Sequence, residues 1–198
     1  SVILNTQVTH NLLKNHSTQE QYFSIARQFC KPKFPRRSLL KENPSNTVVT
    51  FILDETGSME ASRYATIDGF NEYITTLKAD DTPTLLHLTT FNSSNSRLVY
   101  DFEDVSLVKA MTPDDYQPAN LTPLYDAIAD GIIKTDRYLR QNDEKHDVIF
   151  TIMTDGWENC SKRYVLSDIF RMISERERNG WVFNYLGANQ DAWLEAAN

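Results

Sequence analysis

After residue 46, the pattern of apolar and polar positions predicts buried strands alternating with amphipathic helices. Four short, nearly continuous apolar runs are typical of parallel strands buried on both faces; they cover residues 48–53, 85–91, 148–153 and 181–186. Between them, apolar residues recur at helical spacing in three sets: Ile67, Phe70, Ile74 and Leu77; Leu124, Ala127, Ile128, Gly131 and Ile132; Val165, Ile169, Met172 and Ile173. This alternation predicts an α/β, Rossmann-like, doubly wound sheet with helices on both faces.

One further apolar segment breaks the parallel pattern. Residues 98–102 follow Phe91 after only six residues, which is too short for a helical crossover. We therefore expect a hairpin that adds one antiparallel strand at the edge of a mostly parallel sheet.

The first 46 residues differ in composition from the remainder. They hold seven of the 20 basic residues but only two of the 27 acidic ones, and the whole chain has a net charge of -7. We predict a basic, partly helical extension at 1–46, with a helix at 19–29, and one domain at 47–198. Such an arm could touch nucleic acid, although packing against its own acidic domain is the favoured interpretation, and we expect no other nucleic-acid contact.

Composition narrows the class of protein. Of the 198 residues, 40% are hydrophobic and 24% charged, as in ordinary globular proteins, and no apolar run approaches the roughly 20 residues needed to span a bilayer. We expect no membrane contact and no leader segment. Cys30 and Cys160 form no disulfide framework, which favours a reducing, cytoplasmic location, or association with a virion if the source is a phage.

Oxygen-bearing side chains gather where the predicted elements meet. Asp54, Thr56 and Ser58 alternate directly after the first strand, and Gly57 permits a sharp turn. Thr122 precedes the second helix and Asp155 follows the third main strand. Because open α/β sheets bind ligands at the carboxyl ends of their strands, these side chains are expected to converge. Oxygen donors of this kind suit a hard cation such as Mg²⁺.

The ordered set Asp54-x-Thr56-x-Ser58, Thr122 and Asp155 resembles the complete metal-ion-dependent adhesion site of von Willebrand factor A (vWA) domains. The phrases Thr-Gly-Ser-Met, Thr-Pro-Leu-Tyr-Asp-Ala-Ile and Thr-Asp-Gly are similar to the bacterial and bacteriophage branch. The resemblance spans residues 47–193, and Thr56 stands where the family usually has serine. It implies a site for Mg²⁺, Mn²⁺ or Ca²⁺ in which Thr56 and Ser58 ligate directly, Thr122 directly or through water, and both aspartates mainly through water.

Each piece also has a simpler interpretation. Ser58 and Thr122 are good helix N-caps, and Asp155-Gly156 could form only a turn. Trp157, Asn92 and Ser93 are candidate partner contacts, although a packed loop residue is the favoured interpretation of Trp157, and the Asn92–Ser93 segment could be a solvated turn. His87 lies within a predicted strand and is expected to be a satisfied core or edge residue.

The resemblance implies a metal-dependent protein-binding module, without enzymatic activity, that captures an Asp or Glu of a protein partner. One alternative is a Mg²⁺-dependent phosphohydrolase with Asp54 as phosphate acceptor, but Thr56 replaces the second aspartate of the usual Asp-x-Asp pattern. No Walker loop or Gly-x-Ser-x-Gly elbow is found. A structural virion component with a vestigial metal site is the other alternative.

Overall fold

The computed structural model describes residues 46–142 and 144–186. Five strands form one sheet in the order β3-β2-β1-β4-β5. Their bounds are Asn46–Asp54 for β1, Thr84–Phe91 for β2, Ser96–Asp104 for β3, His146–Met153 for β4 and Val182–Leu186 for β5. The predicted strands are all present, and β3 extends beyond the expected 98–102 at both ends.

The sheet is parallel except at one edge. β1 pairs in parallel with β2 and β4, β4 pairs in parallel with β5, and β3 runs antiparallel to β2. The β2–β3 pairing contains register shifts beside Leu86 and Leu88, and Phe102 of β3 takes a left-handed backbone angle, φ 53°. The predicted antiparallel edge strand is therefore confirmed, and it is irregular where the bulge lies.

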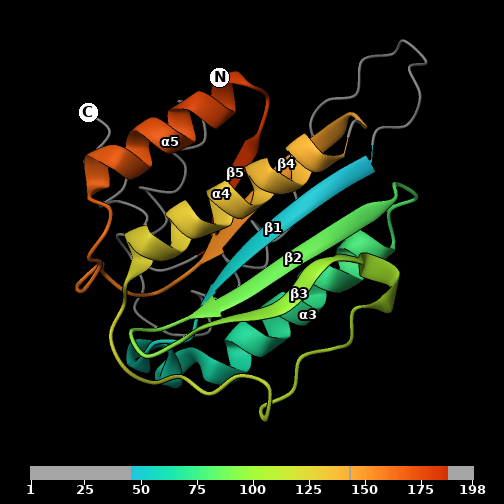
Figure 1. Ribbon diagram of the computed structural model, residues 1–198. Helices are drawn as coiled ribbons and strands as arrows, with labels where there is room; N and C mark the ends of the chain where they lie inside the picture. The colour runs from blue at the N-terminus through green and yellow to red at the C-terminus, as the bar shows by residue number, and fades with distance from the viewer. Residues whose placement is uncertain (1–45, 143, 187–198) are drawn as a thin grey trace, which may run out of the picture.

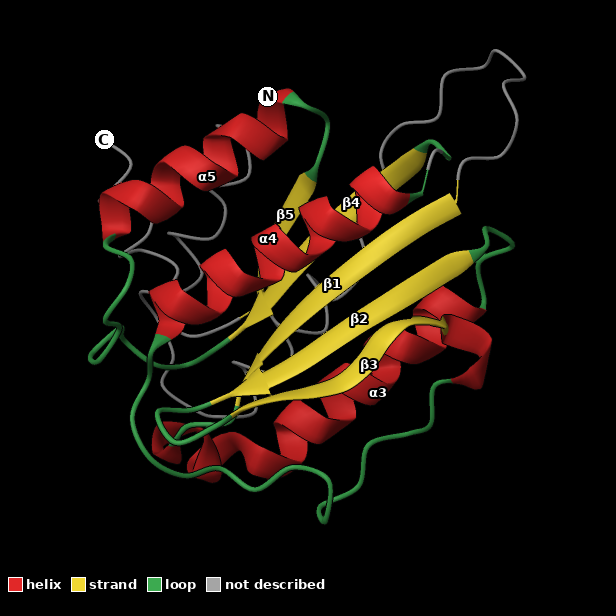
Figure 2. Ribbon diagram, viewed as in Figure 1, coloured by secondary structure: helices red, strands yellow, loops and turns green. Residues whose placement is uncertain are grey.

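Three α-helices cover the two faces of the sheet. α3 (Arg63–Lys78) lies on one face, and α4 (Leu124–Gln141) and α5 (Leu166–Arg178) lie on the other (Figures 1 and 2). Two short 3-10 helices, η1 (Gly57–Ser62) and η2 (Val105–Leu107), follow β1 and β3. This is the doubly wound α/β architecture that the sequence predicts.

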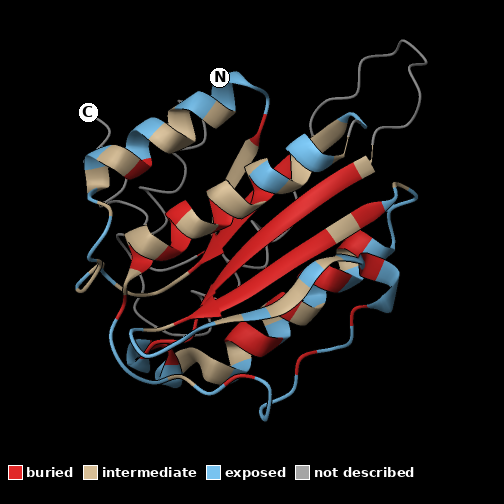
Figure 3. Cartoon of the chain, in the orientation of Figure 1, coloured by how far each residue is buried: buried red, intermediate tan, exposed pale blue. Residues whose placement is uncertain are grey.

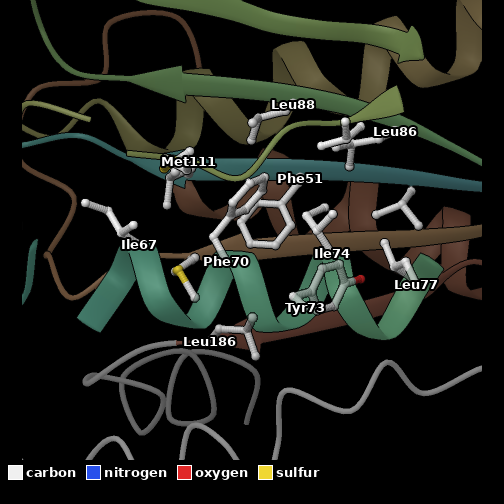
Figure 4. Packing of buried hydrophobic residues seen from close by; sticks show 14 of the residues in the cluster. Phe51, Ile67, Phe70, Tyr73, Ile74, Leu77, Leu86, Leu88, Met111 and Leu186 are labelled. Carbon is white, nitrogen blue, oxygen red and sulfur yellow. The ribbon is translucent and has the colours of Figure 1, made fainter. Parts of the chain in front are cut away.

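Strand alternation divides the buried residues into two cores. Val49, Phe51 and Leu53 of β1 pack toward α3, where Phe51 meets the rings of Phe70 and Tyr73 edge-on (Figure 4). Strand residues that point to the opposite face form the second core with α4 and α5. This core includes Ile52, Phe150, Ile152, Leu124, Ile128, Ile132 and Ile169. β1 is buried along nearly all of its length (Figure 3), as expected for a central parallel strand.

One predicted helix residue, Val165, lies elsewhere than expected, and most of the predicted N-terminal extension falls outside the described residues. Val165 was expected on the buried face of the third helix, but it precedes α5 and is 60% exposed, and only Ile169 of that helix is fully buried. The loop ends one residue later than the periodicity suggested, so Val165 lies on the solvent side. The predicted helix at 19–29 and most of the basic extension lie outside the described residues.

Across the described ranges, none of the helices is both long and apolar enough to cross a membrane.

Candidate functional site

The candidate site lies at the edge of the sheet where the central parallel strands β1 and β4 end. Asp54 is the last residue of β1, and Asp155 follows the end of β4 by two residues. Thr122 lies just before α4, which packs against β1. From β1 the chain first leaves toward β2 and β3 and then crosses over to β4 on the other side of β1. This reversal of direction leaves a crevice between neighbouring loops in open α/β sheets.

The loop after β1 carries three of the predicted ligands. The Asp54 carboxylate accepts a hydrogen bond from the Thr56 backbone N–H at 2.8 Å, which turns the chain back on itself. Gly57 donates its N–H to the Asn120 carbonyl at 3.0 Å and so ties this loop to the segment before α4. As a result, the Thr56 and Ser58 hydroxyl oxygens lie 3.3 Å apart on the same side of the loop.

The other two predicted ligands reach the same point from their own loops. The Thr122 hydroxyl donates to the Thr56 hydroxyl at 3.2 Å, and the Ser58 hydroxyl donates to the Asp155 carboxylate at 2.9 Å. Gly156 lies against this group: a Cβ atom there would stand 3.3 Å from oxygens of Asp54, Ser58 and Thr122 alike. The structure thus brings together all five side chains that the sequence singled out, around a space that any larger residue at 156 would enter.

The spacing of these oxygens suits a small hard cation. Adjacent ligands of an octahedral ion with bonds of 2.0–2.1 Å lie about 3 Å from one another, and the three neighbouring oxygen pairs are 2.9, 3.2 and 3.3 Å apart. Within 46–142 and 144–186, no group of three or more His, Cys, Asp and Glu side chains has a metal-holding arrangement. The five side chains are two carboxylates and three neutral hydroxyls, a set of oxygen donors that could hold Mg²⁺ or Mn²⁺ more readily than a soft metal.

Burial makes the two carboxylates of the site costly to ionise. Asp54 is completely buried, and its burial raises the pKa of its carboxyl above the ordinary value, although hydrogen bonds from Thr154 and Thr56 act in the opposite direction. Burial also raises the pKa of Asp155, against the effect of the Ser58 hydrogen bond. The two charges repel each other, so this corner of the molecule favours any bound positive charge.

Glu55, between two predicted ligands, is a supporting residue that the sequence reasoning missed. Its buried carboxylate accepts the Gln117 N–H at 2.8 Å and faces the Arg97 guanidinium of β3 at 3.4 Å. Arg97 also donates to the Asp115 carbonyl at 2.7 Å. These contacts attach the loop preceding Thr122 to the end of β1. Nothing in the local pattern distinguishes Glu55 from a solvated loop acid, because its partners are distant in sequence.

A second set of missed residues holds the loop after β4 against the start of α4. The Glu158 carboxylate accepts the Tyr125 N–H of α4 at 3.0 Å and also the N–H groups of Cys160 and Ser161. In return, the Asp126 carboxylate of α4 accepts the N–H groups of residues 162–164. The α4 N-terminus is thus capped by Glu158 from another loop, and neither Ser58 nor Thr122 makes a side-chain cap, contrary to the simple capping interpretation.

The proposed contact residues divide into two kinds. Trp157 is 63% exposed beside Asp155, so it is not a packed loop residue. Asn92 and Ser93 connect loops: the Asn92 side-chain amide donates to the Glu55 carbonyl at 3.4 Å, and the Ser93 hydroxyl accepts the Leu121 N–H at 3.1 Å. The Asn92 side-chain oxygen also accepts the N–H groups of Ser94 and Asn95 within its own loop. Partner contact at all three positions remains a prediction.

His87 is buried as predicted but is not satisfied. Its Nε2 lies 3.3 Å from the Thr89 hydroxyl, whereas Nδ1 lies 3.3 Å from an Asp101 carboxylate oxygen without making a hydrogen bond. Burial, aided by nearby Lys134 and opposed by Asp101, lowers the pKa of His87 to about 4. The imidazole is therefore neutral at pH 7, stacked on Phe102 in the irregular part of β3.

The fold and the arrangement of loops define a vWA-like α/β domain. Among solved structures, the chain is similar to the von Willebrand factor type A protein from Catenulispora acidiphila, with a TM-score of 0.52 and 14% sequence identity. The match covers 72% of this chain and 33% of that one, so this chain spans about a third of the bacterial protein's length. No protein-family model and no curated protein matches the sequence.

Proposed function

We propose that this chain is a metal-dependent protein-binding module that holds Mg²⁺, or Mn²⁺ or Ca²⁺ in its place, on Asp54, Thr56, Ser58, Thr122 and Asp155. One observation carries the proposal: five oxygen-bearing side chains from three separate loops converge, three of them beside Gly156, and the three oxygen pairs that link Thr56, Ser58, Thr122 and Asp155 have the spacing of cation ligands. Their sequence order also resembles the vWA adhesion site, and the similarity of fold is consistent with that resemblance.

The composition of the donor set favours binding of an acidic partner. Two carboxylates balance the formal charge of a divalent cation, but both oxygens of Asp54 already accept hydrogen bonds, from the Thr56 N–H and from the Thr154 hydroxyl at 2.6 Å. The vWA resemblance implies that both aspartates act mainly through water, so few protein anions would touch the ion directly. The three hydroxyl ligands bring no formal charge, so the ion keeps affinity for a further anionic oxygen. An Asp or Glu side chain of a protein partner supplies one.

We further propose that the module is not an enzyme. The phosphohydrolase alternative requires Asp54 to attack phosphorus, but this carboxylate is fully buried and both of its oxygens accept hydrogen bonds. A carboxylate fixed in this way orients a loop and is a poor nucleophile. Metal-dependent turnover of p-nitrophenyl phosphate by the purified chain, abolished in Asp54→Asn, would contradict this part of the proposal.

Thermal unfolding tests metal binding directly. Wild-type protein is compared in EDTA and in excess Mg²⁺, Mn²⁺ or Ca²⁺, together with Ser58→Ala and Thr122→Val. At about 100 times its dissociation constant, an ion adds roughly 2.7 kcal/mol to the stability, visible as a rise of several degrees in Tm. We expect this rise in the wild type and little of it in either variant.

Ser106→Ala is the matched control, because Ser106 is an exposed serine of η2, which follows the end of β3 paired with the start of β2, away from the site. It should keep the full metal-dependent rise. Absence of any rise in the wild type, or an equal rise in all four proteins, would overturn the proposed site.

A further inference from the structure

Exposed large apolar side chains are few among the described residues, and two of them border the candidate site. Leu121 is 55% exposed and immediately precedes Thr122, and Trp157 is 63% exposed two residues after Asp155. Large side chains of this kind are expensive to leave in water, and a site rimmed by them is typical of a protein-binding surface.

Direct contacts between their loops hold the two residues at neighbouring positions beside the site, which we call its rim. Asn159 donates its N–H to the Thr122 carbonyl at 3.1 Å, and the Thr122 N–H returns a bond to the Asn159 side chain at 2.9 Å. Leu121 is one residue away from Thr122, and Trp157 is two residues away from Asn159. Gly156, the residue before Trp157, faces the Thr122 hydroxyl, with 3.3 Å between that oxygen and a Cβ at 156.

Both residues are presented by backbone that is already fixed. The Leu121 N–H donates to the Ser93 hydroxyl at 3.1 Å, and its carbonyl accepts the Ser93 N–H at 2.9 Å. On either side of Trp157, the Gly156 N–H donates to the Thr154 hydroxyl at 3.1 Å and the Glu158 carboxylate holds the start of α4. A partner that covers these side chains therefore loses little loop entropy, which is how exposed aromatic residues become binding hot spots.

The acidic residues of the same rim are engaged within the protein, which leaves an exposed cation for an acidic ligand. Glu158 is occupied by hydrogen bonds to three backbone N–H groups and to the Ser161 hydroxyl at 2.6 Å. Asp126 is likewise occupied by three N–H groups and lies 3.6 Å from the Arg163 guanidinium. Arg163 is also paired with Asp130 through two hydrogen bonds at 2.9 and 2.7 Å, so Lys162 is an exposed cation near Trp157.

We propose that Leu121 and Trp157 form an apolar clamp beside the metal, and that the partner is a protein segment with an Asp or Glu and a large apolar residue within two positions of it. The acidic side chain reaches the cation while the apolar side chain packs between Leu121 and Trp157. This inference rests on the proposed metal-dependent function and adds to it the sequence class of the partner.

Selection from a displayed library of random heptapeptides tests the clamp. The full chain is immobilised in Mg²⁺, and bound peptides are eluted with EDTA. Enriched sequences should combine an acidic residue with Leu, Ile, Phe or Trp within two positions. Their affinity, measured by fluorescence polarisation, should fall about tenfold or more in Trp157→Ala and in Leu121→Ser, as hot-spot truncation does.

Leu107→Ala is the matched control, because Leu107 is 64% exposed but belongs to η2, beside the opposite end of β2. It should change the affinity less than twofold, and all three variants should keep the metal-dependent rise in Tm. If that rise is present but the enriched peptides lack apolar residues, or bind Trp157→Ala as well as wild type, the clamp is wrong and the metal site stands. If the rise itself is absent, the underlying function has failed.

Discussion

At the residue scale, the buried carboxylate of Asp54 lowers the free energy of unfolding in the absence of a cation. A fully buried carboxylate with a like charge nearby destabilises the fold unless a cation neutralises it. Because its pKa is raised in the folded state, the folded protein binds the proton more readily than the unfolded chain does. The destabilisation is therefore greatest at neutral pH and is relieved as the pH falls through that raised pKa.

Asp54→Asn should separate stability from metal binding. The amide keeps an oxygen for the Thr56 N–H and an NH₂ group for the Thr154 hydroxyl, while the buried charge disappears. In EDTA at pH 7, urea unfolding should show a gain of about 0.5–2 kcal/mol, the usual size for a stabilising substitution, and the metal-dependent rise in Tm should be lost. Asp68→Asn, at an exposed position of α3, should do neither. A variant less stable than wild type in EDTA would show that the carboxylate is structural.

His87 should make the protein sensitive to mild acid. Its pKa is lowered to about 4 in the folded protein, against an ordinary 6.5, so the unfolded chain takes up a proton first as the pH falls. The stability that comes from keeping His87 neutral is fully present above about pH 6.5 and is lost progressively toward pH 4. The total loss in the free energy of unfolding is about 3 kcal/mol.

Urea unfolding between pH 7.5 and pH 4.5 measures this loss. His87→Gln should show a flatter pH dependence than wild type, whatever its stability at pH 7.5. His146→Gln, at a partly exposed position of β4, is the matched control and should retain the wild-type slope. Parallel profiles for wild type and His87→Gln would contradict the prediction.

At the scale of elements, α4 approaches the sheet more closely than α3 does at their glycines. A Cβ at Gly131 of α4 would stand 2.7 Å from the Ile52 side chain and 2.9 Å from Phe150, whereas at Gly69 of α3 the nearest atom, in Met153, is 3.5 Å away. The contacts at Gly131 are too short for a methyl group, whereas the contact at Gly69 is not. The close approach brings the N-terminal end of α4, and with it Thr122, to the end of β1.

The two glycines should respond to alanine in opposite ways. Gly131→Ala overpacks the second core and should cost about 1–3 kcal/mol, more than the helix-propensity gain of about 1 kcal/mol. Gly69→Ala finds ordinary van der Waals space and should stabilise the protein by about 0.5–1 kcal/mol through that same propensity. Urea unfolding of both variants decides the matter, and a stabilised Gly131→Ala would mean that α4 moves away freely.

At the scale of the whole molecule, the described part of the chain forms two hydrophobic cores, one on each face of the sheet. In residues 46–142 and 144–186, the sheet, α3, α4 and α5 bury their apolar faces against one another. The predicted domain boundary near residue 46 stays a prediction, because the residues before it lie outside the described ranges.

Removal of residues 1–45 should leave the domain intact, because the change of composition and the turn cluster before residue 47 predict a boundary there. We expect a cooperative thermal transition for the shortened chain and the same metal-dependent rise in Tm as in the full chain, since all five proposed ligands lie after that boundary. Differential scanning calorimetry of both forms measures this. Loss of the cooperative transition would show that the extension belongs to the core and that the predicted boundary is wrong.

The sequence by itself determined the order of elements and the composition of the site. Short apolar runs such as residues 48–53 are typical of strands buried between two layers, and helical spacing in α4 indicates which face it buries. Asp54, Thr56, Ser58, Thr122 and Asp155 could be singled out because strand ends meet at one edge of a parallel sheet. These features depend on local periodicity and topology, which a single sequence carries.

Only the tertiary structure decided what surrounds and fixes those residues. Glu55, Arg97 and Glu158 act through partners 33 to 62 positions away, and no local pattern encodes such pairs. The exposure of Trp157 and of Val165 likewise depends on where a loop ends, to within one residue. Burial and long-range hydrogen bonds are properties of the packed chain, and through them the fold sets the charge balance of the site and the apolar residues on its rim.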